Sequence, residues 1–93
     1  MTDTKSSRRS EILDEANCLV HGDRQQSYGP PEVNFANIAE RWSQLLGVDL
    51  EPWMVGVMMA DLKLARLASG HPQPDTFVDI CGYAALAGEL ADG

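Results

Sequence analysis

Apolar residues recur every three or four positions in four separate stretches of the chain, and this spacing predicts amphipathic helices. The predicted helices cover about residues 10–21, 31–46, 49–69 and 74–91. No stretch of the sequence alternates between apolar and polar residues as a strand would, and the sequence contains no internal repeat. The pattern therefore predicts a single all-α domain, residues 1–93, built as a four-helix bundle.

Capping and turn-forming residues separate the predicted helices. Ser10 is the expected N-cap of the first helix, Gly47 the expected end of the second, and Asp49 the expected cap of the third. Residues 1–9 are polar and predict a flexible N-terminal arm. Residues 22–31 have no apolar periodicity, which predicts a long loop of the kind that often carries function.

Charge and cysteine content narrow the classes of function. The 93 residues hold seven Lys and Arg against fourteen Asp and Glu, a net charge of −7. This charge argues against binding to DNA or to an anionic membrane, yet it leaves room for a small phosphorylated ligand held by a few cations or a metal. No transmembrane run or signal peptide is recognisable. Cys18 and Cys81 lie far apart and outside any metal-binding motif, so we expect neither a disulfide framework nor a zinc site. We expect a cytoplasmic protein, and its small size favours self-association.

Asp61 is the most informative residue of the third predicted helix. A helical wheel places it in the middle of an apolar face, which consists of Trp53, Met54, Val57, Met58, Leu64, Ala65 and Ala68. A carboxylate in a core is costly unless it is paired, protonated or bound to a metal. Asp61 is therefore either a structural residue that accepts a hydrogen bond from an indole or a backbone amide, or a ligand for a metal or substrate inside the bundle.

Two further carboxylates lie one turn apart on the fourth predicted helix. Asp75 and Asp79 share a helix face that Tyr83 continues, although Asp75 could instead serve only as an N-cap. Together with Asp61 they offer three carboxylates from two helices. Hard oxygen ligands of this kind suit Mg²⁺ or Mn²⁺, the ions that accompany phosphates.

Basic and polar residues nearby are candidates for ligand contacts. Lys63 and Arg66 are predicted on the side of the third helix away from Asp61, where they form either a solvated face or a set of phosphate contacts. Asn34 and Tyr28 either bind a base or sugar or stabilise their own segments. The residue types alone do not choose between these alternatives.

Two strings of residues resemble a family of small proteins from phages, prophages and actinobacteria. The strings are Asp23-Arg24 with Tyr28-Gly29-Pro30-Pro31, Asn34-Phe35, Ile38-Ala39 and Trp42, and then Met59-Ala60-Asp61-Leu62-Lys63-Leu64-Ala65-Arg66-Leu67 with Asp75 and Val78-Asp79-Ile80-Cys81-Gly82-Tyr83-Ala84. The resemblance covers about residues 20–88, which is nearly the whole chain beyond the first helix.

That family is similar to the all-α NTP pyrophosphohydrolases of the MazG-like superfamily, in which an ExxE and a later ExxD motif hold Mg²⁺ on a triphosphate while water attacks. The resemblance implies that Asp61 takes the place of the second Glu of ExxE and Asp79 the end of ExxD. Met58 and Thr76 stand where the first Glu of each motif would be, and Asp75 lies one residue before the second of these positions. The resemblance also implies a homodimer or homotetramer with sites shared between chains.

Three functions are compatible with the sequence. The first is a nucleotide-binding, Mg²⁺- or Mn²⁺-dependent NTP pyrophosphohydrolase that releases a monophosphate and pyrophosphate, with Asp61 and Asp79 as catalytic residues. In this hypothesis Asp61, Asp75 and Asp79 hold the metal, and the substrate contacts are Lys63, Arg66, Tyr28, Asn34 and Tyr83. The second function is sequestration of a nucleotide without hydrolysis. The third is a structural or interaction protein, a helical homo-oligomer in which Asp61 is a satisfied core residue.

Overall fold

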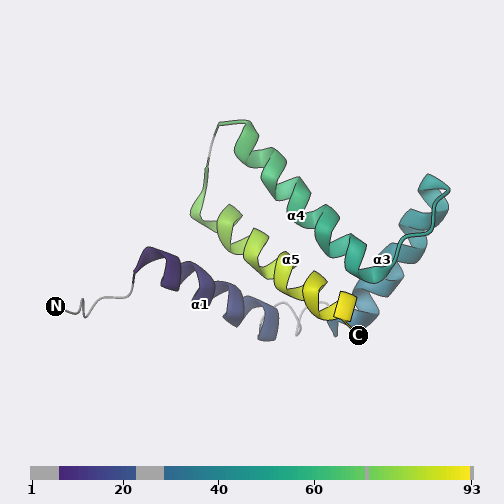
Figure 1. Ribbon diagram of the computed structural model, residues 1–93, viewed down its shortest axis with the longest axis horizontal. Helices are drawn as coiled ribbons and strands as arrows, with labels where there is room; N and C mark the ends of the chain where they lie inside the picture. Colours follow the sequence, from purple (N-terminus) through teal and green to yellow (C-terminus); the bar gives the residue numbers. More distant parts are fainter. Residues whose placement is uncertain (1–6, 23–28, 71, 93) are drawn as a thin grey trace.

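The structure, a computed structural model, describes residues 7–22, 29–70 and 72–92. All regular secondary structure in these ranges is helical, as Figure 1 shows, and the chain order is α1 (Arg8–His21), α3 (Pro31–Leu46), α4 (Pro52–Ala68) and α5 (Pro74–Asp92). The prediction of an all-α fold is therefore confirmed for the described ranges, and the four helices found there correspond to the four predicted ones. None of these described helices has the length and apolar character needed to span a bilayer.

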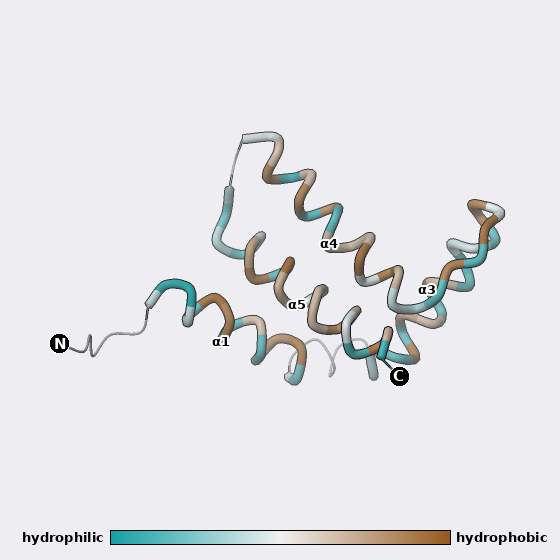
Figure 2. The backbone as a smooth tube through the Cα atoms, viewed as in Figure 1, coloured by the Kyte–Doolittle hydropathy of each residue, from teal (hydrophilic) through white to brown (hydrophobic). Residues whose placement is uncertain are grey.

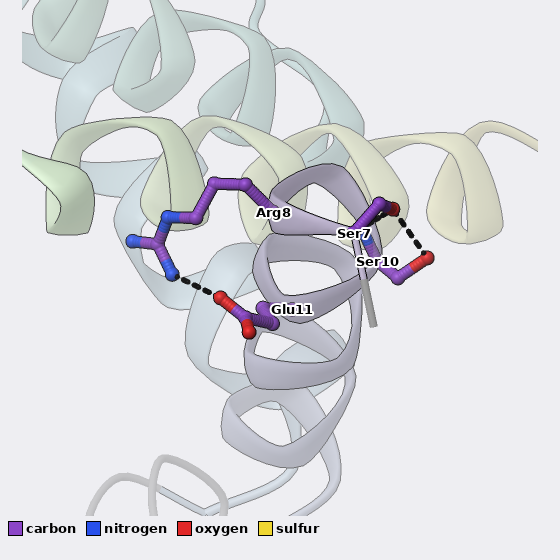
Figure 3. Close-up of polar contacts among 4 residues, drawn as sticks. All are labelled: Ser7, Arg8, Ser10 and Glu11. Atoms are coloured by element: carbon purple, nitrogen blue, oxygen red, sulfur yellow. Dashed lines mark hydrogen bonds and ion pairs between the residues drawn. The ribbon is translucent and has the colours of Figure 1, made fainter. Parts of the chain in front are cut away.

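The first helix begins earlier than the sequence predicted. Its N-cap is Ser7 rather than Ser10, because the Ser7 side chain accepts a hydrogen bond from the Ser10 backbone N–H at 3.2 Å. Figure 3 shows this end of α1, where Arg8 and Glu11 also form an ion pair at 2.9 Å. Both serines suit a cap, but Arg8 and Arg9 between them are good helix formers, and Glu11 in the first turn complements the helix dipole.

The connection between α3 and α4 is fixed by local backbone chemistry. Gly47 ends α3 in the left-handed conformation, at φ 73°, and its N–H donates to the Ser43 carbonyl at 2.9 Å. The Ser43 hydroxyl in turn accepts from the Leu50 N–H at 2.8 Å. The N-cap of α4 is Glu51, not the predicted Asp49, because Pro52 occupies the first helical position and holds the residue before it in an extended conformation.

The core lies where the four described helices meet. Figure 1 shows α4 and α5 as an antiparallel pair, with α1 along the side of α5 that faces away from α4 and α3 crossing one end. The buried cluster takes residues from every helix, namely Val20, Phe35, Ala39, Val55, Tyr83 and Leu86. Among the described helices α5 is the central element, since it packs against both α4 and α1.

The side of α4 that packs against α5 is opposite to the predicted one. Val55 and Gly56 are buried, and Lys63 two turns later is half-buried. The predicted core residues instead lie half-buried or exposed, and they are Trp53, Met54, Val57, Met58, Leu64, Ala65 and Ala68. Asp61, in the middle of that face, is exposed. The predicted burial of Asp61 is therefore wrong for the single chain.

The physical reason for this difference is that α4 is apolar on almost every side. Figure 2 shows hydrophobic residues along its whole length, so the apolar pattern alone does not choose a face. Gly56 determines which face of α4 packs against α5. A Cβ at this position would lie 2.8 Å from the Cβ of Ala87 and 3.2 Å from the carbonyl oxygen of Tyr83, closer than side chains tolerate. Only glycine permits α4 and α5 to approach this closely.

Candidate functional site

An ion pair joins α4 and α5 beside the core. The Nζ of Lys63 lies 3.0 Å from Oδ2 of Asp79, and the two side chains are only 16% and 19% exposed. Lys63 reaches this position because it follows Val55 and Gly56 on the face of α4 that packs against α5. Lys63 thus lies on the side of α4 away from Asp61, as predicted, but of the two alternatives for this side a solvated face is excluded for Lys63. A pair this poorly solvated contributes little net stability, since desolvation offsets much of the attraction between the charges.

Asp79 also borders a small cavity between α1 and α5. The cavity has a volume of about 10 Å³, and its lining residues are Leu19, Val20, Val78, Asp79, Gly82, Tyr83 and Leu86. This volume is enough for about one water molecule. Tyr83 is buried in this lining one turn after Asp79, so the predicted sharing of a helix face by these two residues is confirmed. The candidate site thus combines two opposite charges, a phenol and a water-sized space.

The three carboxylates predicted to bind a metal do not meet in one chain. Asp79 is paired with Lys63, whereas Asp61 and Asp75 are both exposed. Within residues 7–22, 29–70 and 72–92, no group of three His, Cys, Asp or Glu side chains is arranged to hold a metal ion. Asp61 projects from the side of α4 that faces away from α5, and Asp75 lies in the first turn of α5. The helical spacing was read correctly, but the rotation of α4 separates these carboxylates.

The remaining candidate ligand residues are spread over the molecule. Arg66 is exposed in the last turn of α4, three residues beyond Lys63. Asn34 is half-buried in the first turn of α3, where its backbone N–H donates to the Pro30 carbonyl at 3.0 Å. Tyr28 lies outside the described residues. The structure therefore brings Lys63, Asp79 and Tyr83 to one region. Arg66 lies at the margin of this region on α4, and Asn34 lies on a different helix, α3.

A second cavity lies between α1, α3 and α5. Its volume is about 440 Å³, and it is lined by Val20, His21, Pro31, Glu32, Ala85, Leu86 and Glu89. This size suits a small organic ligand. Two glutamates in the lining oppose the approach of a phosphate, because like charges repel across a short distance. The lining of the smaller cavity includes Asp79, whose carboxylate is paired with Lys63, whereas the described residues that line the larger cavity include no Lys or Arg.

The Lys63–Asp79 pair is the feature that sequence reasoning missed. Its signal was present in the helical wheel, since Lys63 lies close in angle to Met59, Gly56 and Pro52, with Asp61 on the opposite side. Finding it required knowledge of which side of α4 packs against α5. That knowledge depends on the close approach at Gly56, which the composition of the apolar face does not reveal.

Comparison with known proteins places the sequence among phage relatives. The model of a family described as a domain of unknown function, DUF6378, matches residues 11–91. The Gene 55 proteins of Mycobacterium phage D29 and Mycobacterium phage L5 are 38% identical over 73 residues and 41% identical over 76 residues. These matches cover 78% and 81% of this chain but 48% and 49% of the relatives. The chain therefore spans about half the length of the two relatives. No solved structure gives a significant match.

Proposed function

We propose that this chain, which belongs to the DUF6378 family, binds a nucleotide through its phosphates at the junction of α4 and α5. The observation that carries the proposal is the poorly solvated ion pair between Lys63 and Asp79. A phosphate chain with bound Mg²⁺ brings a negative and a positive charge to the same place. Lys63 would then bind a phosphate oxygen and Asp79 the metal, so that each charged group exchanges one partner for another.

Binding without hydrolysis is the function that the geometry supports best. A Mg²⁺-dependent hydrolase needs several oxygen ligands around the ion, and Asp61 and Asp75 do not join Asp79 in one chain. The finer proposal remains the reaction of the MazG-like proteins, which convert an NTP to a monophosphate and pyrophosphate. This reaction would require other oxygen ligands to complete the set of metal ligands to which Asp61 and Asp75 belong. Such ligands could be the phosphates themselves or carboxylates of a second copy.

The remaining contacts follow from position. Arg66 lies about one turn beyond Lys63 on α4 and is exposed, so its guanidinium could reach a terminal phosphate. Tyr83 borders the cavity beside Asp79 and could contact the sugar or base. We propose Asn34 and Tyr28 as further contacts to the base or sugar on the strength of the residue pattern alone.

The test is one incubation of the purified protein with Mg²⁺ and a mixed panel of NTPs, dNTPs and cyclic nucleotides. Liquid chromatography of the free nucleotides before and after heat denaturation of the protein separates the hypotheses. We expect one nucleotide to disappear from the free pool and to return unchanged on denaturation. A monophosphate with pyrophosphate would establish hydrolysis instead, and an unchanged nucleotide pool would contradict both proposals.

Two variants tie the result to the site. Lys63→Met and Asp79→Asn each remove one charge of the pair and should weaken nucleotide retention at least about tenfold, since each loses a charge-assisted contact. Asp14→Asn removes an exposed carboxylate from α1 and should bind like the original protein. Retention that is equal in all three variants would place the nucleotide elsewhere.

A structural or interaction role is the second candidate, and a separate observation favours it. Val57 and Leu64, which flank Asp61 on the outer side of α4, expose 49% and 50% of their surface. Such a face needs a partner or solubilising features around it.

A further inference from the structure

Hydrogen-bond acceptors line the large cavity between α1, α3 and α5. Its polar side chains are His21, Glu32 and Glu89. An ionised carboxylate only accepts hydrogen bonds. The Nδ1 of His21 lies 3.0 Å from the Asn17 carbonyl oxygen, to which it can only donate, so Nε2 of the neutral ring is an acceptor as well. The described lining side chains therefore fit a ligand that supplies N–H donors.

These acceptors fit an organic group better than a metal ion. Within the described ranges no three His, Cys, Asp or Glu side chains are arranged to hold a metal ion, so the three acceptors do not converge on one point. The cavity has room for a larger group, since its volume is about 440 Å³. The rest of its lining is apolar and consists of Val20, Pro31, Ala85 and Leu86. A planar heterocycle with N–H groups along one edge matches both features, because its faces pack on apolar side chains and its edge donates to the acceptors.

One stripe of α5 connects the large cavity to the ion pair between Lys63 and Asp79. The stripe consists of Asp79, Gly82, Leu86 and Glu89, which follow one another at spacings of three and four residues and so share one side of the helix. The first three line the small cavity, and the last two line the large one. Asp79 and Glu89 are ten residues apart, a rise of about 15 Å along the helix. An extended nucleoside triphosphate spans a comparable distance, so its phosphates can lie beside Lys63 while its base lies in the large cavity.

We infer that the large cavity binds the base of the nucleotide and that this base is guanine. The inference rests on the proposed function, because it takes the phosphates to lie at Lys63 and Asp79. Guanine carries its N1–H and its N2 amino group side by side on one edge, so a single carboxylate accepts from both. Glu89 takes this role, since it continues the stripe from Asp79, and the second amino hydrogen is left for Glu32. Adenine and cytosine present one amino group beside an acceptor nitrogen, and uracil presents mainly carbonyl oxygens, which a carboxylate repels.

The charges also set the direction in which the nucleotide lies. Glu32 and Glu89 repel a phosphate group from the large cavity, whereas Lys63 attracts one at the other end of the stripe. Phosphates about 15 Å from Glu89 are little affected by its charge, because the Debye length is about 8 Å at physiological ionic strength. The two ends of the stripe therefore select opposite ends of one nucleotide.

The test compares GTP with ITP, which lacks only the N2 amino group, and with ATP by isothermal titration calorimetry in the presence of Mg²⁺. GTP should bind at least about tenfold more tightly than either, because the other bases leave Glu89 without its donors. Glu89→Gln should weaken GTP binding at least about tenfold and remove the preference over ITP, since the amide replaces an acceptor by a donor. Glu40→Gln is the matched control, because Glu40 is an exposed glutamate of α3 outside the cavity lining. Circular dichroism verifies that both variants keep their helices, and Glu32→Gln takes the place of Glu89→Gln if that variant does not.

Guanosine, which has no phosphate, separates a failure at the base from a failure at the phosphates. It should bind more weakly than GTP and lose affinity in Glu89→Gln, whereas Lys63→Met should leave its binding unchanged. If this holds but GTP binds no more tightly than guanosine, the base site is supported and the phosphate site is contradicted. If GTP, ITP and ATP bind equally and all weaken in Lys63→Met, the phosphate site is supported and the base site is overturned. No binding of either GTP or guanosine, or equal weakening by Glu40→Gln and Glu89→Gln, would overturn the base site as well.

Discussion

The two sides of α4 differ in how they are built, although both are apolar. The inner side contains Gly56, which lets the backbone of α5 approach, and it tolerates one charged residue because Asp79 neutralises Lys63. The outer side contains larger aliphatic residues and one carboxylate for which the structure records no ion pair within the described residues. A small residue where two helices approach closely, such as Gly56, therefore marks the face of a helix that packs against another helix of the same chain. Hydrophobicity alone does not identify that face.

The largest expected difference between the two sides of α4 is in the stability lost when Val55 or Val57, two residues apart, is shortened to alanine. Val55 is fully buried on the inner side, so Val55→Ala should lower the free energy of unfolding by about 2–3 kcal/mol. Val57→Ala on the outer side should lower it by less than about 0.5 kcal/mol when the protein is dilute. Urea denaturation of both variants measures the difference. Equal losses in dilute protein would break the distinction between the two sides.

Alanine substitutions of two glycines, Gly56 and Gly88, test the same comparison, and their expected effects on stability are of intermediate size. Gly56→Ala places a methyl group 2.8 Å from the Cβ of Ala87 and should cost about 1–2 kcal/mol, even though alanine favours helix. Gly88 lies on α5, where an added Cβ would meet no neighbouring atom within 4 Å. Gly88→Ala should therefore stabilise the protein by about 0.5–1 kcal/mol. Thermal unfolding of the two variants should therefore shift in opposite directions. A shift in the same direction would mean that α4 and α5 are not held together at Gly56.

The smallest expected effect concerns the ion pair. A double-mutant cycle with Lys63→Met and Asp79→Asn should give a coupling of about 1 kcal/mol in unfolding experiments without nucleotide. The low value reflects the desolvation that offsets the attraction between the two charges. A coupling near zero would indicate that the two side chains separate in solution. A much larger coupling would make the pair a structural feature and weaken the proposed exchange with a phosphate and a metal.

The helices could be predicted from the sequence because local chemistry defines their ends. Pro31, Gly47 and Pro52 each act on their own neighbours, so the limits of α3 and α4 required no knowledge of the fold. Two caps were misplaced: Ser7 and Ser10 both satisfy the local requirements at α1, and at α4 the cap is Glu51, directly before Pro52, instead of Asp49. Caps and breakers are short-range features, and the sequence displays them directly.

The candidate site could not be predicted because it depends on the rotation of one helix. Asp61, Asp75 and Asp79 were grouped on the assumption that the side of α4 with Asp61 faces α5, and the opposite side does so. The phage family and the helical class were recognisable from residue strings that do not depend on this rotation. Contacts between helices are long-range properties, and an all-round apolar helix leaves them undetermined until its neighbours are known.

The attachment of α1 has a consequence for the order in which the molecule opens. Only Ala16 and Val20 are buried on this helix, and its main contact is with α5. We therefore expect α1 to detach in a local fluctuation that costs less free energy than global unfolding, so its amides should exchange with solvent before those of α4 and α5. On refolding, the hairpin of α4 and α5 closes the shorter loop and should form first, and α1 should dock afterwards.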